Sequence, residues 1–255
     1  MPLLTIITPS FNSAKTIERT IKSILDQEFL DYEYLIIDGA SKDNTLDIVK
    51  KYHSSFDGKM KWYSEPDKGI YDAFNKGIRL AKGEYVWIVN SDDYMEPNAL
   101  SVLGNYICSQ KTKPEVISAA MNFINMQGEI SRVAKSNQKQ ADYCYKTNGM
   151  GVTHPATIVA KSVYSQYGLY DDEFKICGDI DWFFRIYKSG VKICFIDDIV
   201  TNMTEGGVST TFNLKKMAKD RRRLLKKRYH NFLLEAYYFV RWAKRVYFLM
   251  RKNKL

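Results

Sequence analysis

The sequence predicts an α/β protein whose mostly parallel central sheet is covered by helices on both faces. Two observations predict this class. In the first 110 residues, short apolar runs that suit buried strands alternate with segments whose apolar residues recur at helical spacing. Each apolar run also ends in a polar loop, as at the ligand-binding edge of a parallel sheet.

The individual elements follow from this alternation. Strands are expected at residues 3–8, 34–37, 60–63 and 85–89, and helices where Ile17, Ile21 and Ile24, then Leu46, Val49 and Tyr52, then Ile70, Phe74 and Ile78 recur. Pro9 is expected to stop the first strand, and Ser13 to cap the first helix.

The second part of the chain is less regular. Residues 115–125 and 130–134 are expected to pair as strands across a turn at Gly128, and a helix over 179–189 precedes a strand at 191–196. The change of rhythm near residues 106–113 predicts parts at 1–110 and 111–214, which are able to share one sheet.

Residues 215–255 form a basic tail with 15 Lys and Arg against two acids, whereas residues 1–214 carry 23 basic and 27 acidic residues. The cluster at 221–228 has three interpretations: a solvated face, a nucleic-acid arm or a membrane-surface element. An apolar stripe follows at helical spacing, formed by Phe232, Ala236, Phe239, Val240, Ala243, Val246, Tyr247 and Met250. This pattern favours an amphipathic helix on anionic lipid. The acidic body argues against nucleic acid.

Other features of the sequence bear on the cellular compartment of the protein. The sequence has no run of 18 apolar residues and no basic leader at its start, so neither a spanning helix nor a secretory signal is expected. The four cysteines lack C-x-x-C spacing and are expected to be buried thiols in a reducing cytosol.

Acidic side chains recur in the polar loops, and Asp92 and Asp93 are adjacent. Such a pair is either a solvated turn or a cation site. The sequence lacks a G-x-G-x-x-G after the first strand, a P-loop and a G-x-S-x-G elbow. Phosphate binding through Mg²⁺ or Mn²⁺ on hard oxygen ligands therefore remains.

Several motifs together resemble glycosyltransferase family 2, whose members have the GT-A nucleotide-sugar fold. They are TPSFN at 8–12, IDGASKDNT at 37–45, SEPDKGIYDAFNKG at 64–77, NSDD at 90–93, GDIDWFFR at 178–185 and GGVS at 206–209. The resemblance spans about residues 3–210 and points to bacterial transferases that build O-antigen, capsule or exopolysaccharide units.

The resemblance implies roles for particular residues. The donor-binding residues would be Pro9, Phe11, Asp38, Asp67, Asp72 and Asp92, and Asp93 would bind Mn²⁺ or Mg²⁺. Residues 1–110 would thus bind the nucleotide-sugar, and 111–214 the acceptor. Asn90 stands where the family's acidic motif commonly has its first acid.

Asp179 would be the catalytic base. Aligning the family's base motif on Arg185 places Asp179 on the catalytic aspartate and Gly178 where a glutamate is common. A simple helix cap is the alternative for Asp179. The acceptor side would include Asp181, Trp182 and His154, although His154 also suits a proton donor, a third metal ligand or a plain loop residue. Gly206 and Gly207 suggest either a turn or a loop that closes over the diphosphate.

The resemblance thus implies an inverting, metal-dependent glycosyltransferase that moves a sugar from a nucleotide-sugar, expected to be a UDP-sugar, to a polyprenyl-diphosphate-linked acceptor. The protein would be cytoplasmic and peripheral on the inner face of the cell membrane, attached through residues 215–255, with no nucleic-acid partner. The alternatives are a nucleotidyltransferase of related fold and a non-catalytic, membrane-docked module that binds nucleotide-sugars.

Overall fold

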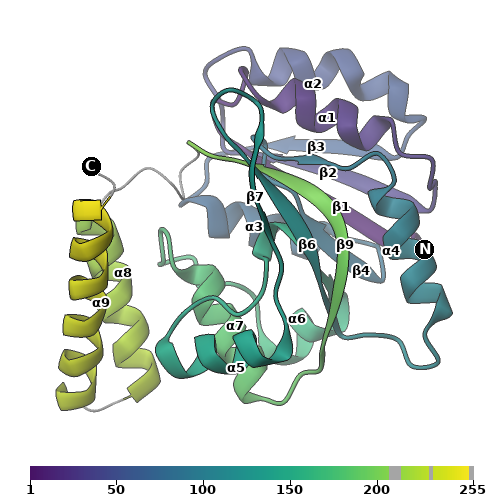
Figure 1. The fold of residues 1–255 in the computed structure, drawn as a ribbon. Coiled ribbons are helices and arrows are strands. Elements are labelled where there is room, and N and C mark those ends of the chain that lie inside the picture. The colour runs from purple at the N-terminus through teal and green to yellow at the C-terminus, as the bar shows by residue number, and fades with distance from the viewer. Residues whose placement is uncertain (207–213, 230–231, 253–255) are drawn as a thin grey trace.

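A computed structural model describes residues 1–206, 214–229 and 232–252 (Figure 1). The strands are β1 (Leu4–Ser10), β2 (Tyr32–Asp38), β3 (Met60–Ser64), β4 (Tyr85–Ile88), β5 (Tyr94–Met95), β6 (Val116–Ile124), β7 (Ile130–Ala134), β8 (Thr157–Ala160) and β9 (Ile193–Thr204). The helices are α1 (Ile17–Leu25), α2 (Thr45–His53), α3 (Ile70–Leu80), α4 (Ala99–Ser109), α5 (Gln138–Thr147), α6 (Lys161–Tyr167), α7 (Gly178–Lys188), α8 (Leu214–Tyr229) and α9 (Phe232–Lys252). Single 3₁₀ turns lie at Ser54–Phe56 and His154–Ala156.

Within the described residues the strands form one sheet in the order β3-β2-β1-β4-β8-β6-β9-β5, and β7 pairs with β6. The first four strands are parallel, as predicted. Beyond β4 the sheet is mixed, because β8 runs antiparallel between β4 and β6. The hairpin of β6 and β7 at Gly128 is confirmed. β4 precedes the division expected near residue 110 and β8 follows it. Since these two strands pair, both parts of the chain contribute to one sheet.

Two local expectations in the first loop are wrong. β1 continues through Pro9 to Ser10. The carbonyl of Ile7 accepts a hydrogen bond from the N–H of Val89, the first residue after β4. Backbone groups of alternate residues in a strand point to the same side, so those of Pro9 also face the β4 side, beyond the end of β4. Its missing N–H therefore costs no hydrogen bond in the sheet. Ser13 does not cap α1 through its side chain, and its hydroxyl lies 2.8 Å from that of Ser91.

Alternating residues of the central strands fill two cores, one on each face of the sheet. Ile6 contributes to the core that α1, α2 and α4 cover, whereas Ile7 contributes to the core that α3, α6 and α7 cover. The expected helical layers on both faces are therefore present (Figure 1).

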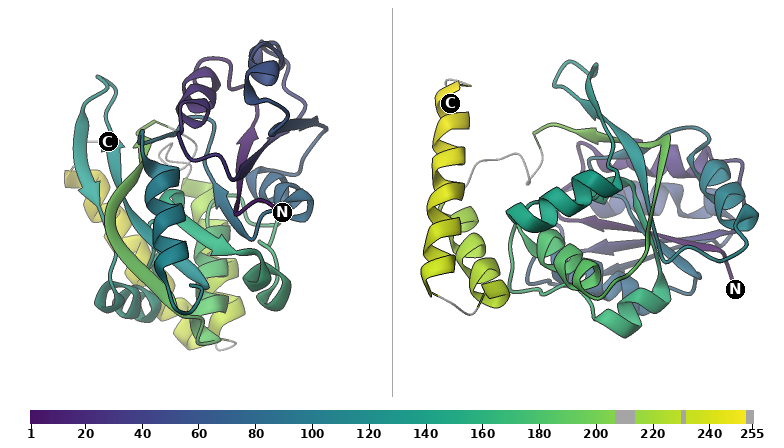
Figure 2. Two further views of the ribbon diagram at one scale, coloured as in Figure 1. Left: turned by 90° about the vertical axis from the view of Figure 1, so that its right-hand side faces the viewer. Right: turned by 60° about the horizontal axis from the view of Figure 1, so that its bottom comes forward.

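The basic tail folds as α8 and α9, which lie side by side at one flank of the molecule (Figure 2). Leu224 and Leu225 of α8 are almost completely buried, and Leu224 joins the second core. α9 packs on α8 through the stacked rings of Tyr238 and Tyr229, whose centroids are 4.8 Å apart. Among the described helices, none has both the length and the apolar composition that a bilayer span requires.

Much of the basic cluster faces the protein body and is not free for lipid, contrary to expectation. Arg223 and Lys227 pair with Asp171 at 3.3 and 3.0 Å, and Arg221 donates to the carbonyl of Asn148 at 2.5 Å. The cysteines also differ from expectation, since all four are free thiols but only Cys177 is buried.

Candidate active site

Three loops meet at the carboxyl edge of β1, β2 and β3 around the buried carboxylate of Asp38. Its Oδ1 accepts hydrogen bonds from the hydroxyls of Ser10 at 3.1 Å and Ser41 at 2.5 Å, and its Oδ2 accepts from the Ser41 N–H at 2.9 Å and the Ser64 hydroxyl at 2.7 Å. With both oxygens occupied, Asp38 orders the loops and does not face a ligand as expected.

Phe11 and Asp67 approach each other over Gly39 at the same edge. A Cβ on Gly39 would lie 2.4 Å from Oδ2 of Asp67 and 3.3 Å from the Phe11 ring, so glycine allows both side chains to close over the backbone. The Phe11 side chain is 62% exposed. Burial raises the pKa of Asp67, whose Oδ1 accepts from the Gly69 N–H at 2.9 Å. An exposed ring beside a carboxylate suits a nucleoside.

Two further residues expected on the donor side, Pro9 and Asp72, support the wall formed by Phe11 and Asp67. Pro9 is buried within β1. Asp72 accepts from the Lys68 N–H at 3.0 Å and lies 3.6 Å from Nζ of Lys76, so it stabilises the first turn of α3.

Asp93, the expected metal ligand, is turned inward. Its residue exposure is 1%, its Oδ1 accepts from the Thr204 N–H at 3.1 Å, and its Oδ2 accepts from the amide of Asn90 at 3.1 Å. Burial, together with the nearby charge of Asp92, raises the pKa of Asp93 to about 7. In this conformation Asp93 therefore offers no oxygen to a ligand, which corrects the expectation.

Asp92 is only partly buried, and among the described residues its carboxylate accepts no side-chain hydrogen bond. Burial raises its pKa, while the charge of Arg19 opposes that shift. Its backbone carbonyl accepts from Arg19 at 2.9 Å and from the Thr204 hydroxyl at 2.7 Å. The backbone is thus held while the carboxylate stays available.

The acidic loop, residues 90–93, fits a divalent cation that is shared with a substrate. No group of three or more His, Cys, Asp or Glu side chains suited to a metal occurs within the described residues. Mg²⁺, however, is commonly bound by one or two carboxylates plus substrate phosphates and water. Oδ1 of Asn90 is buried there without a hydrogen-bond partner in the part of the chain that the structure describes. The carboxylate of Asp92 and this amide oxygen are hard ligands that suit such an ion.

Asp179 lies in the first turn of α7 and is partly exposed. Its Oδ1 accepts from the Ile180 N–H at 2.8 Å and lies 3.4 Å from the hydroxyl of Tyr71. Burial raises the pKa of Asp179, which the charge of His154 partly offsets. A carboxyl with a raised pKa at the rim of a site is suited to accept a proton.

His154 lies near the sheet edge, and its charge acts on the carboxyl of Asp179. It precedes β8, which runs antiparallel to β4, so it lies near the end of β4 that leads into the acidic loop. Its Nε2 is 2.9 Å from the hydroxyl of Tyr170, and burial lowers its pKa. His154 therefore lies near the carboxyl edge of the sheet, close enough for its charge to lower the pKa of Asp179.

Two expected acceptor residues are closed off. Asp181 is 4% exposed and pairs with Lys227 at 2.8 Å and Arg185 at 3.2 Å. Trp182 is completely buried and stacks on Tyr170 with a centroid distance of 5.5 Å. Helical rotation turns these side chains away from Asp179, toward α8 and the core, so the expectation that they contact an acceptor is wrong.

Other parts of the site were missed or lie outside the structure. Arg19 holds the backbone of Asp92, and the hydroxyl of Tyr71 lies beside the carboxylate of Asp179. Neither residue was assigned a role from the sequence, although Tyr71 lies within the motif at 64–77. Asp220 was visible as the one acid in α8. The expected loop at Gly206 and Gly207 lies only partly within the described residues, because residues 207–213 fall outside them.

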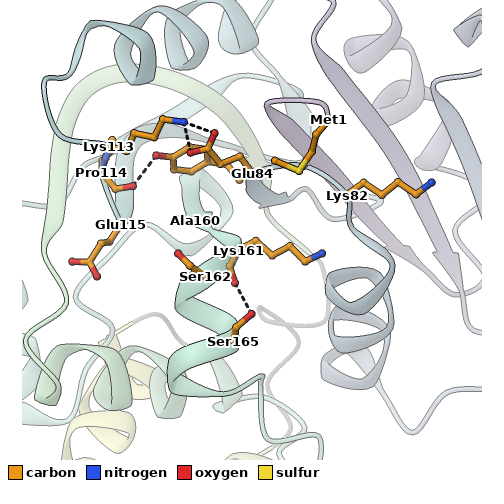
Figure 3. Close-up of a pocket in the computed structure, with 12 residues that line it drawn as sticks. Met1, Lys82, Glu84, Lys113, Pro114, Glu115, Ala160, Lys161, Ser162 and Ser165 are labelled. Carbon is orange, nitrogen blue, oxygen red and sulfur yellow. Dashed lines mark hydrogen bonds and ion pairs between the residues drawn. The ribbon is translucent and has the colours of Figure 1, made fainter.

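A cleft of about 450 Å³ lies at the opposite edge of the sheet, beside the start of β4 (Figure 3). Its Lys113 is paired with Glu84 at 2.6 Å, and Lys161 donates to the carbonyl of Ala81. Lys113, Glu84 and Lys161 are thus paired within the protein, and none of residues 90–93 lines the cleft.

The Phe11–Asp67 pair, the loop at residues 90–93 and Asp179 thus lie toward the carboxyl edge of the sheet, where α/β folds bind their ligands. The family model described as "Glycosyl transferase family 2" matches residues 5–168, and the chain belongs to this family.

Curated relatives agree with this placement. The chain is 33% identical over 130 residues to a chondroitin synthase of Pasteurella multocida, which covers 51% of this chain and only 13% of the synthase. It is 26% identical over 227 residues to a PGL/p-HBAD biosynthesis glycosyltransferase of Mycobacterium bovis, covering 86% of this chain and 83% of that protein.

Solved structures share the fold. Staphylococcus aureus TarS 1–349 in complex with UDP-GlcNAc has a TM-score of 0.72 and 22% identity, over 93% of this chain and 69% of the TarS chain. The mannosyltransferase PcManGT of Pyrobaculum calidifontis, in complex with GDP-Man and Mn²⁺, has a TM-score of 0.65 and 16% identity, over 90% and 65% of the two chains. The fold class predicted from sequence is confirmed.

Proposed function

We propose that the protein is an inverting glycosyltransferase that moves a sugar from a UDP-sugar to the hydroxyl of a lipid-linked glycan. The observation that carries the proposal is Asp179. It is a partly exposed carboxyl with a raised pKa, beside His154 at the edge where the acidic loop leaves β4. Family membership and the donor-bound neighbours support the same chemistry.

In the proposed reaction, Asp179 accepts the proton of the acceptor hydroxyl as that oxygen attacks the anomeric carbon. The bond from this carbon to the diphosphate oxygen breaks, UDP leaves, and a single in-line displacement inverts the configuration. Phe11 and Asp67 bind the nucleoside side, and Asp92 with Asn90 would hold Mn²⁺ or Mg²⁺. That ion would neutralise the charge that develops on the leaving diphosphate.

The acceptor and the location are inferred from the tail. The outward face of α9 exposes Leu233, Tyr237, Val240 and Tyr247 along one stripe, which the exposed Lys244 interrupts and the exposed Arg241 flanks. Apolar and aromatic side chains among cations suit an anionic bilayer surface. We therefore place the enzyme on the cytoplasmic face of the membrane, where a polyprenyl-diphosphate-linked acceptor for surface polysaccharide would be within reach.

The test compares wild type with Asp179→Asn in full-length protein. Release of UDP or GDP from a panel of UDP- and GDP-sugars with Mn²⁺ or Mg²⁺ identifies the donor, and lipid-linked acceptors are then tested. The asparagine keeps the shape but accepts no proton, so transfer should fall by roughly 10²–10⁴-fold with donor binding nearly unchanged. A wild-type protein that binds but never turns over a nucleotide-sugar would instead be a binding module, and release of pyrophosphate from an added nucleoside triphosphate and sugar phosphate would indicate a nucleotidyltransferase.

A further inference from the structure

Asp220 is the one acidic residue in α8, whose other charged residues are all basic. Its residue exposure is 3%, and a single oxygen, Oδ2, accepts three backbone hydrogen bonds. The donors are the N–H groups of Lys175 at 2.8 Å, Ile176 at 2.6 Å and Cys177 at 3.1 Å. Such a convergence of backbone donors on one buried carboxylate is a strong, charge-assisted contact.

These three N–H groups belong to the residues that lead directly into α7. The helix begins at Gly178, and Cys177 at its N-cap position provides no side-chain cap. The first turn of a helix needs external acceptors for its N–H groups, and the residues before it set its direction. Asp220, more than 40 residues further along the chain, therefore fixes the entry to the helix that carries Asp179.

Asp220 is linked to Asp179 through the backbone of Ile176 and the side chain of Tyr71. The carbonyl of Ile176 accepts from the hydroxyl of Tyr71 at 2.7 Å, and that hydroxyl lies 3.4 Å from Oδ1 of Asp179. A Cβ on Gly178 would lie 2.8 Å from the Tyr71 ring, so the start of α7 is pressed against this ring. The position of the 175–177 segment and that of Asp179 are thus linked by direct contacts.

α8 itself is firmly placed against the body. Leu224 and Leu225 are each 1% exposed, Lys227 pairs with Asp171 and Asp181, and Arg223 pairs with Asp171 and Glu173. The carboxylate of Asp220 therefore has a fixed position from which to hold the segment.

We propose that Asp220 is a positioning residue for the base, and that α8 is consequently a working part of the active site. This inference rests on the proposed role of Asp179. Proton transfer and in-line attack depend on placement to within about 1 Å, and a misplacement of that size can cost roughly 100-fold in rate. Loss of the Asp220 contacts would free residues 175–177 and let Asp179 shift, while the donor wall at β1, β2 and β3 stays in place.

The experiment uses full-length Asp220→Ala and Asp220→Asn with the donor and acceptor found for the wild type. Asp220→Ala should lower kcat by about 10–100-fold, with the donor KM within about twofold of wild type. Asp220→Asn should be intermediate, because its amide oxygen still accepts hydrogen bonds but carries no charge. Hydrogen exchange of the 175–177 amides should accelerate in the same order.

Arg223→Gln is the matched control, since it weakens the docking of α8 without touching the three N–H groups. It should lower the melting temperature and leave kcat unchanged. Equal losses of kcat in Arg223→Gln and Asp220→Ala would reduce the role of Asp220 to general stability. An unchanged kcat in Asp220→Ala would overturn this inference alone, whereas a wild type without any sugar turnover would overturn the proposed function as well.

Discussion

The guanidinium of Arg19 donates a hydrogen bond of 2.9 Å to the backbone carbonyl of Asp92. The same group donates to the hydroxyl of Thr204 at 2.7 Å and lies 4.3 Å from the centroid of the Tyr94 ring. One side chain from α1 thus ties the acidic loop to the end of β9 and leaves the carboxylate of Asp92 available.

We predict that Arg19→Met raises the donor KM by about tenfold, because the charge-assisted hydrogen bonds from Arg19 to the Asp92 carbonyl and to Thr204 are lost, and with them the orientation of the acidic loop toward the diphosphate. Arg79→Met, on α3, is the control. Steady-state kinetics with the donor at saturating metal would measure the effect. Equal donor KM values for the two variants would show that Arg19 does not hold the loop.

Experiments on the metal requirement should distinguish the role of Asp92 from that of Asp93. We expect EDTA to abolish transfer and Mn²⁺ to restore it in wild type. Asp92→Asn should lower transfer by about 100-fold or more and weaken Mn²⁺ binding, because a carboxylate ligand is lost. Asp93→Asn, whose carboxylate is used internally, should retain the metal requirement and mainly lower the melting temperature. Calorimetry of UDP binding with and without Mn²⁺ tests this, and metal-independent binding would contradict it.

The acid limb of the rate profile should report Asp179. Burial raises the pKa of this carboxyl, so transfer should fall with decreasing pH well before the ordinary aspartate pKa of about 3.9 is reached. His154→Gln should move the limb to higher pH, because the charge of His154 lowers the pKa of Asp179. The exposed His53 serves as the control position in His53→Gln.

The same raised pKa has a consequence for stability. A carboxyl whose pKa is higher in the folded state is protonated there at pH values where the unfolded chain is ionised. Its contribution therefore favours folding at low pH and is lost as the pH rises from the unfolded pKa through the folded one. Melting temperatures across this window should depend less on pH in Asp179→Asn than in wild type.

The outward face of α9 should bind anionic bilayers. Leu233→Ser combined with Val240→Ser removes two exposed apolar side chains from this face and should release the protein from anionic liposomes, with donor turnover unchanged. Ile130→Ser combined with Val133→Ser, at exposed positions of β7, is the matched control. Co-sedimentation at low and high salt measures the effect. Wild-type protein that never co-sediments with such liposomes would remove the membrane proposal.

The sequence predicts the first four strands, their helices and the polar edge because these depend on local periodicity and turn chemistry. The antiparallel entry of β8 was missed because it depends on pairing with strands far away in the chain. The position of Asp179 at the start of a helix was also predictable, whereas its role as the base stays a proposal. The orientation of Trp182 and Asp181 was not predictable, since a motif fixes spacing along a helix but not which face meets the core.

The tail shows the same limit more clearly. The sequence does not show that the basic residues at 221–228 have partners. In the structure, Lys227 pairs with Asp171 and Asp181, which lie far earlier in the chain. Burial of Leu224 likewise depends on core residues that come from earlier parts of the chain.

The contact of Asp220 with residues 175–177 also bears on how the protein matures during synthesis. Domains generally fold from the N-terminus as the ribosome releases the chain. The nucleotide-binding edge can therefore assemble early, whereas the entry to α7 receives its carboxylate only after α8 has left the exit tunnel. Because α9 follows α8, residues 232–252 occupy the tunnel while α8 emerges. A nascent chain would thus complete the surroundings of Asp179 only after most of α9 has been synthesised.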